Sequence, residues 1–191
     1  LAYMPQIWTS DNSDAIARLK MQYSTSMCYP VYSISSHVTA SPNHQCGRDT
    51  SLKTRADVAY CGTFGYELDV TKMSDEEFKE IKAQIKFEKR IQDLMCNGDL
   101  YRLINPYETN YCSWEVISKD KKHIFVMACK VLAVAQTKSE KVKLQGLDVN
   151  KRYRNMLTGK VYSSDFLMYH GIRVNYEMKD FSTVVFEFAE I

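Results

Sequence analysis

The chain has 191 residues, of which 45% are hydrophobic and 25% are charged. This is the composition of a globular protein, and it excludes fibrous repeats and long disordered tracts. The 25 basic and 23 acidic residues are interleaved and leave a formal net charge of +2, so no nucleic-acid partner is expected. No apolar run approaches the roughly 20 residues that cross a membrane, so no membrane partner is expected.

The first predicted element is a strand-to-helix step. Residues 1–8 are short and largely apolar, and they lead into a polar turn. A helical pattern follows, and we expect the helix to begin near Ser13 or Asp14, with Ile16 and Leu19 on its apolar face. An apolar segment, a polar turn and a helix make up the βα step of an α/β protein.

Two further steps of the same kind follow. A capping box at Ser74-Asp75-Glu76-Glu77 opens the last and longest helix, and Gly62 closes the helix before it. The predicted elements are a strand over 31–39, a helix over 52–61, a strand over 63–70 and a helix from 75 to 97.

After Tyr107 the pattern changes to short strands separated by turn signals, which indicates an antiparallel β-sandwich. Its predicted strands are 112–118, 123–132, 141–144, 151–155, 160–162 and 183–187. The fold class is therefore α/β plus all-β. Three βα units cannot close a barrel that needs eight, so they are interpreted as the end of one.

Six scattered cysteines, without a Cys-x-x-Cys pair, indicate reduced thiols and a cytoplasmic protein. There is no signal peptide. Because the chain starts at Leu1 rather than Met, we expect the natural N-terminus and any targeting signal to be missing.

Two carboxylates follow the first strand, in Trp8-Thr9-Ser10-Asp11-Asn12-Ser13-Asp14. Barrel enzymes keep their active sites at the carboxyl ends of the strands, and glycosidases need two carboxyl groups beside the scissile bond. The alternative is that both carboxylates only cap the helix. Asp14 lies closer to the helical repeat and is the better cap, whereas Asp11 lies closer to the strand and is the better active-site candidate.

Other polar groups are weaker candidates. His37, His44 and Cys46 lack the tight pairs of a structural zinc site, so no metal and no cofactor are expected. His44 and Arg48 could contact substrate from a loop. Lys53, Arg55, Glu67 and Asp69 could be catalytic, although ion pairs or a cap are the better interpretation. Cys28 and Cys61 have no neighbouring base in the sequence, which favours a quiet buried role.

The segment from Tyr3 to Lys20 resembles the W-T-S-D-N-x-D-A-I-x-R-L-K segment of family-36 glycoside hydrolases, the α-galactosidases. The resemblance continues through further short stretches, which are Gln22-Tyr23, Thr25-Ser26, Tyr29-Pro30, Ser36-His37-Val38, Pro42-Asn43-His44-Gln45, Gly47-Arg48, Leu52-Lys53-Thr54-Arg55, Gly62 to Asp69, Gly98 to Arg102, and Leu144-x-Gly146-Leu147-Asp148. It is dense up to about Arg102 and covers nearly the whole chain.

The resemblance implies a retaining hydrolase that removes terminal α-linked galactose from sugars such as melibiose and raffinose. It implies residues 1–104 as the last three βα units of a (β/α)8 barrel and residues 105–191 as a C-terminal β-sandwich. Asp11, not Asp14, matches the general acid/base that contacts the substrate. The full-length enzyme is expected to be a homo-oligomer.

In this family the nucleophile lies in a K-W-D-type strand, and the galactose site uses an S-C-x-x-G-x-x-R stretch. This sequence contains neither motif. The expectation is a fragment that is inactive without the missing N-terminal part of the same enzyme, because a retaining glycosidase needs both carboxyl groups. The alternative is a non-catalytic fragment or pseudoenzyme that acts as a carbohydrate-binding or assembly module. Ser24, which stands where the family has Gly, would be strained if that position had positive φ.

Overall fold

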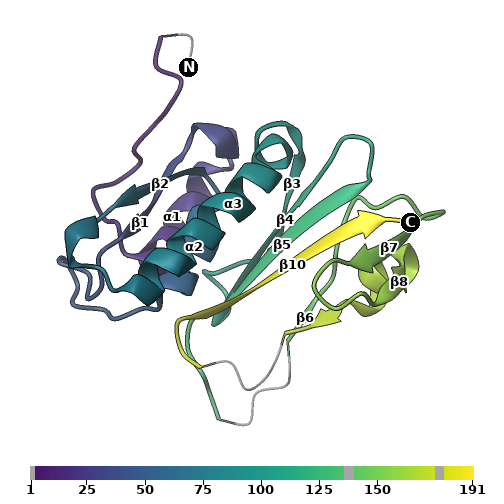
Figure 1. Ribbon diagram of the computed structural model, residues 1–191. Helices are drawn as coiled ribbons and strands as arrows, with labels where there is room; N and C mark the ends of the chain where they lie inside the picture. The colour runs from purple at the N-terminus through teal and green to yellow at the C-terminus, as the bar shows by residue number, and fades with distance from the viewer. Residues whose placement is uncertain (1–2, 136–139, 175–178) are drawn as a thin grey trace. The chain divides into compact units, whose positions relative to one another are not determined.

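The computed structural model describes residues 3–135, 140–174 and 179–191, so the first two residues of the predicted strand over 1–8 lie outside the described residues. The chain divides into two compact units, Leu1–Cys96 and Asn97–Ile191 (Figure 1). None of the described helices is long and apolar enough to cross a membrane.

The first unit is built on parallel extended segments. Strands β1 (Ser35–Thr39) and β2 (Thr63–Glu67) pair in parallel, and Ile7 forms an isolated parallel bridge to Ile34, just before β1. The carboxyl ends of all three segments therefore face the same edge, which is the edge where α/β proteins keep their sites.

The first predicted strand is wrong in length, because Ile7 alone pairs among residues 3–8, which the structure describes. Pro5 has no N–H to donate to a ladder. Thr9 has a φ of 68°, which turns the chain out of the extended conformation two residues after Ile7. The pairing of the described residues of this segment is thus confined to Ile7, the middle of the three residues between these two interruptions.

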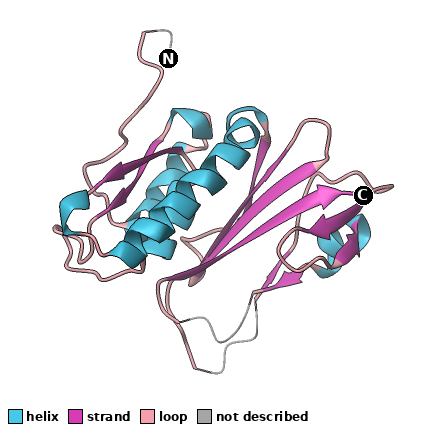
Figure 2. Ribbon diagram, viewed as in Figure 1, coloured by secondary structure: helices cyan, strands magenta, loops and turns pink. Residues whose placement is uncertain are grey.

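Three helices follow the extended segments, as predicted, and Figure 2 shows them beside the two strands. They are α1 (Ala15–Thr25), α2 (Leu52–Ala59) and α3 (Asp75–Asn97). Helix α2 packs against β1 and α1. The predicted capping box is confirmed, because Ser74 N–H donates to Glu77 Oε2 at 2.9 Å and Glu77 N–H donates to Ser74 Oγ at 3.2 Å.

Two predicted strands are shorter than expected. Val31–Ser33 and Val70–Lys72 are 3-10 turns rather than strand. Ser33 N–H donates to Pro30 O at 3.0 Å, and Asp69 accepts from Thr71 N–H at 3.0 Å. These local bonds use backbone groups that a sheet ladder would otherwise have paired.

The second unit contains an antiparallel sheet in the order β3-β4-β5-β10-β7-β8 and a two-stranded pair, β6-β9. The strands are β3 (Asp99–Ile104), β4 (Tyr111–Ile117), β5 (His123–Lys130), β6 (Lys141–Val142), β7 (Arg152–Asn155), β8 (Val161–Ser163), β9 (Ile172–Arg173) and β10 (Ser182–Glu190). The six predicted strands are confirmed in position, with somewhat different ends. Two strands, β3 and β9, were not predicted.

The core of the second unit packs on one face of this sheet, where Ile124, Val126, Tyr153 and Phe188 are fully buried. Burial of this apolar surface, at roughly 25 cal/mol per Å², is the main stabilising contribution of the unit. The chain is therefore a mixed helix-and-sheet protein, parallel in the first unit and antiparallel in the second.

Candidate active site

Asp11 lies on an exposed turn that follows the Ile7 bridge, at the carboxyl end of the first extended segment. Its backbone carbonyl accepts a hydrogen bond from the Gln45 side chain at 2.9 Å. Within the part of the chain that the structure describes, its carboxylate makes no hydrogen bond or ion pair. Asp11 is thus accessible from solvent.

The turn that leads to Asp11 is strained at Thr9. Ser10 N–H donates to Trp8 O at 2.9 Å, which closes a three-residue turn around Thr9, and Thr9 has a φ of 68°. A β-branched residue at positive φ costs about 1–3 kcal/mol and persists only where its surroundings hold it. Such strain gathers at functional sites.

Arg18 of α1 stabilises the strained turn through hydrogen bonds. Its Nη1 donates to Thr9 Oγ1 at 2.7 Å and to Trp8 O at 3.3 Å, and its Nη2 donates to Ser35 O. Arg18 is 6% exposed. Burial lowers the pKa of its guanidinium from the ordinary value. The Arg18 side chain therefore connects the strained turn to β1 through hydrogen bonds.

Asp14 has a different environment from Asp11. It is 1% exposed, it caps α1 by accepting from Ala17 N–H at 2.8 Å, and its Oδ2 pairs with Arg48. The predicted capping role of Asp14 is therefore confirmed. Arg48, a possible substrate contact from the sequence, makes this ion pair with a side chain that is 30% exposed.

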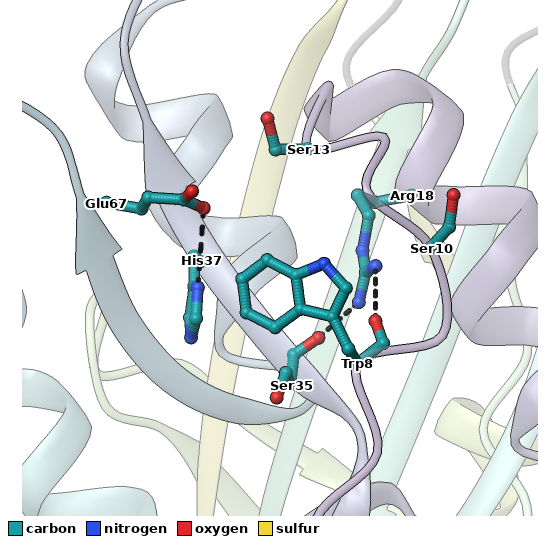
Figure 3. Close-up of a pocket in the computed structure, with 7 residues that line it drawn as sticks. All are labelled: Trp8, Ser10, Ser13, Arg18, Ser35, His37 and Glu67. Carbon is teal, nitrogen blue, oxygen red and sulfur yellow. Dashed lines mark hydrogen bonds and ion pairs between the residues drawn. The ribbon is translucent and has the colours of Figure 1, made fainter.

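A small hollow lies beside the Asp11 turn, and Figure 3 shows the side chains around it. It is lined by Trp8, Ser10, Ser13, Arg18, Ser35, His37 and Glu67. Its volume is about 10 Å³, close to the smallest space that holds one water molecule. Asp11 is not among the lining residues, and no sugar ring fits this space.

His37 joins two sides of the hollow. Its ring meets the Trp8 ring edge-on at 4.7 Å, and its Nδ1 lies 3.6 Å from Glu67 Oε2. That nitrogen is buried and has no hydrogen-bond partner among the described residues. A Cβ on Gly65 would come within 2.9 Å of His37 Cδ2, so Gly65 leaves the room for this ring.

The remaining predicted candidates do not meet at one site. His44 and Cys46 are exposed, and the described residues include no group of three or more His, Cys, Asp or Glu that could hold a metal ion. Of the four charged residues considered together, each has its own partner. Lys53 pairs with Asp57, Arg55 donates to Thr39 O and Ser51 O, Glu67 faces His37, and Asp69 caps Val70–Lys72 and pairs with Lys72 at 3.3 Å.

The six cysteines differ in exposure. Cys61 is fully buried, and burial raises the pKa of its thiol well above the ordinary value, as a quiet structural role requires. Cys28 is exposed, so its predicted buried role is wrong. Ser24 lies within α1 in helical conformation, so the strain considered for a positive φ at this position does not arise.

The amino-acid sequence matches two family models. The family model described as Melibiase matches residues 1–98, and the one described as Glycosyl hydrolase family 36 C-terminal domain matches residues 111–188. The first match alone covers more than half of the 191 residues. The chain belongs to the melibiase family, glycoside hydrolase family 36.

Its relatives in the family are α-galactosidases. It is 44% identical over its whole length to alpha-galactosidase AgaA of Geobacillus stearothermophilus and 45% identical over 189 residues, 99% of its length, to alpha-galactosidase Mel36A of Lactobacillus acidophilus. Both alignments cover only 26% of the relative, so this family-36 chain spans about a quarter of their length.

Solved structures of family-36 enzymes agree. The crystal structure of AgaA matches with a TM-score of 0.95 at 44% identity, over 99% of this chain and 26% of that one. The galactosidase domain of the α-galactosidase-sucrose kinase AgaSK matches with a TM-score of 0.94 at 40% identity, over 98% of this chain and 26% of that one. Substituted forms of AgaA have been solved with raffinose and with stachyose.

Proposed function

We propose that this chain is part of a retaining α-galactosidase in which Asp11 is the general acid/base and contacts the substrate. The observation that carries the proposal is the contrast between two nearby carboxylates. Asp14 is buried in the helix cap and the ion pair to Arg48, whereas Asp11 is exposed on a strained, tethered turn. A carboxylate that must exchange protons with bound sugar and water has to be accessible.

The proposed reaction has two balanced steps. In the first, the Asp11 carboxyl donates its proton to the glycosidic oxygen as a second carboxylate attacks the anomeric carbon, so the leaving sugar departs with that proton. In the second, the Asp11 carboxylate takes a proton from water, and the resulting hydroxyl displaces the enzyme carboxylate to release galactose. Water is the acceptor in hydrolysis, and a sugar hydroxyl in its place would give galactosyl transfer.

The second carboxylate is proposed to come from outside these residues. The two carboxyl groups of a retaining enzyme lie about 5–5.5 Å apart, and the sequence carries no K-W-D segment. The relatives are about four times as long as the aligned region, which is 26% of each. The 191 residues alone are therefore expected to be inactive and to need the N-terminal part of the same enzyme.

The substrates proposed are oligosaccharides with a terminal α-linked galactose, such as melibiose and raffinose. The names of the relatives and the raffinose and stachyose complexes of AgaA support this class. No cofactor or metal enters this chemistry, and self-association of the full enzyme is expected.

The architecture proposed for the whole protein follows the family. Residues 1–104 contain the last three βα units of a (β/α)8 barrel, and residues 105–191 form a β-sandwich, which β3 (Asp99–Ile104) joins by pairing with β4. Three parallel segments, each followed by a helix, support the first assignment, and an antiparallel sheet supports the second. The scattered cysteines, without a Cys-x-x-Cys pair, favour a reducing compartment such as the cytoplasm.

The test is hydrolysis of melibiose by the complete protein, with Asp11→Asn compared against Asp69→Asn. Both residues are exposed carboxylates on loops that follow extended segments of the first unit, so the pair matches in charge change and exposure. We expect Asp11→Asn to lose at least about 100-fold in kcat/KM, as loss of an acid/base residue does, and Asp69→Asn to stay close to the parent. Unchanged hydrolysis by Asp11→Asn would overturn the assignment. Absence of hydrolysis by the parent would favour the non-catalytic module.

A further inference from the structure

We infer that Arg18 is the positioning residue of this active site, because it sets the direction of Asp11 by clamping the Thr9 turn onto β1. The inference rests on the proposed function of Asp11. Arg18 does not touch the reacting atoms and acts through the backbone of the turn. It is one helix turn beyond Asp14 on α1, on the buried side of the helix.

The clamp is made by one guanidinium that reaches two elements. On the turn it binds the Thr9 hydroxyl at 2.7 Å and the Trp8 carbonyl at 3.3 Å. On β1 it binds the carbonyl of Ser35, and Figure 3 shows the bonds to Trp8 and Ser35. Its Nε donates to Gln22 Oε1 at 3.3 Å, which fixes the plane of the guanidinium. A planar group with five N–H donors can hold these separate acceptors at once, and a lysine cannot.

A role in packing alone does not explain this residue. Arg18 is 6% exposed, and every acceptor that the described residues offer it is neutral. Burying a charge among neutral groups costs free energy. An aliphatic side chain fills a buried position on this helix without that cost, as the neighbouring Leu19 does at 0% exposure. What the guanidinium adds is the set of directed bonds to the turn.

Those bonds act on the residue whose backbone is strained. Thr9 has a φ of 68°, and the turn relaxes unless neighbouring groups hold it. From Thr9 the chain reaches Asp11 in two residues, and Asn12 N–H donates to Ser10 Oγ at 3.1 Å, which makes that stretch compact. A shift of Thr9 is therefore passed to Asp11, and a misplacement of about 1 Å in a reacting group can cost on the order of 100-fold in rate.

Arg55 provides a matched control. It is also a helical arginine, it is 9% exposed, and it also donates to backbone carbonyls, those of Thr39 and Ser51. It makes no recorded contact with the Trp8 to Asp11 segment among the described residues. Arg55→Lys therefore measures what the loss of a buried guanidinium does to stability, without loosening the turn.

The experiment compares Arg18→Lys, Thr9→Val, Arg55→Lys and Asp11→Asn in the complete protein. Each is assayed with melibiose, whose leaving group needs a proton, and with p-nitrophenyl α-galactoside, whose leaving group needs little acid help. Thr9→Val keeps the β-branched shape at an exposed position and removes only the hydroxyl that Arg18 binds. It keeps the test available if Arg18→Lys does not fold.

Arg18→Lys is expected to lower kcat for melibiose on the order of 100-fold with little change in KM, and to lower kcat for the aryl substrate much less. Thr9→Val should show the same selectivity with a loss of about 10-fold, as expected for one hydrogen bond to a charged group. Arg55→Lys should change the rates with the two substrates by the same factor.

The inference would be overturned by a folded Arg18→Lys protein that lost activity toward both substrates equally, or toward neither. If Arg18→Lys failed to fold, a Thr9→Val protein that did not lose more activity toward melibiose than toward the aryl substrate would overturn it. Failure of the proposed function gives a different pattern, either no hydrolysis by the parent or no selective loss in Asp11→Asn. In that case both the proposed function of Asp11 and the positioning role of Arg18 would be rejected.

Discussion

The Asp14 carboxylate and the Arg48 guanidinium form an ion pair at the first turn of α1, where Asp14 is almost fully buried and Arg48 is 30% exposed. The same carboxylate caps the helix through Ala17 N–H. The pair therefore joins the start of α1 to the loop that follows β1, and it removes Asp14 from the accessible surface on which Asp11 lies.

Asp14→Ala should destabilise the start of α1 by about 1–3 kcal/mol, because it removes both the cap and the partner of a charged group. Asp14→Asn retains an oxygen that can cap and should cost less. Hydrogen exchange of the α1 amides, followed by mass spectrometry on the complete protein, measures both effects. Equal protection of α1 in the parent and in Asp14→Ala would contradict the proposed coupling.

Gly65→Ala should lower stability by about 1–3 kcal/mol, because the added methyl group would meet the His37 ring at 2.9 Å. The double variant Gly65→Ala/His37→Ala removes the obstructing ring. It should therefore be more stable than the sum of the two single changes predicts, and thermal unfolding midpoints of the four proteins give the coupling. Strict additivity would show that His37 does not occupy the space beside Gly65.

Glu115 of β4 should make the second unit lose stability as the pH rises. Burial raises its pKa from the ordinary 4.5 to about 8, while the bond from Gln145 N–H, at 2.8 Å to Oε2, lowers it. The folded state then holds a proton that the unfolded state releases, so this contribution is fully present below about pH 4.5 and is lost progressively up to about pH 8.

Glu115→Gln should remove that pH dependence and protect β4 better than the parent at pH 8 by a few kcal/mol, at about 1.4 kcal/mol for each unit of pKa. Its side-chain oxygen can still accept from Gln145. Hydrogen exchange of the peptide that covers 111–130 at pH 5, 7 and 8 tests this. Parallel pH profiles for the two proteins would show that Glu115 is ionised in the folded state.

The sequence predicted the helix starts well, because caps are local. Asp14 and the Ser74–Glu77 box satisfy N–H groups within three residues of themselves, so their spacing contains the needed information. Strand ends were less predictable. Strand β3 depends on pairing with β4, which lies later in the chain. The loss of pairing around Ile7 depends on the backbone angle at Thr9.

The groups around the Asp11 turn were not predicted as a cluster. His37 faces Gly65 only through the parallel register of β1 and β2, which the sequence does not specify. A signal for Arg18 was present, because Asp14, Arg18 and Gln22 repeat at i, i+4 and i+8 on one helix face. Three polar residues on the side that buries Leu19 indicate a buried network rather than simple packing.

The central claim, that Asp11 is the general acid, is tested most directly with a series of aryl α-galactosides whose leaving groups differ in pKa. If Asp11 protonates the leaving oxygen, Asp11→Asn will leave the activated substrates nearly intact and lose progressively more rate as the leaving-group pKa rises. A plot of log kcat/KM against leaving-group pKa will then be much steeper for Asp11→Asn than for the parent. Parallel plots for the two proteins would contradict the claim and assign the proton to another residue.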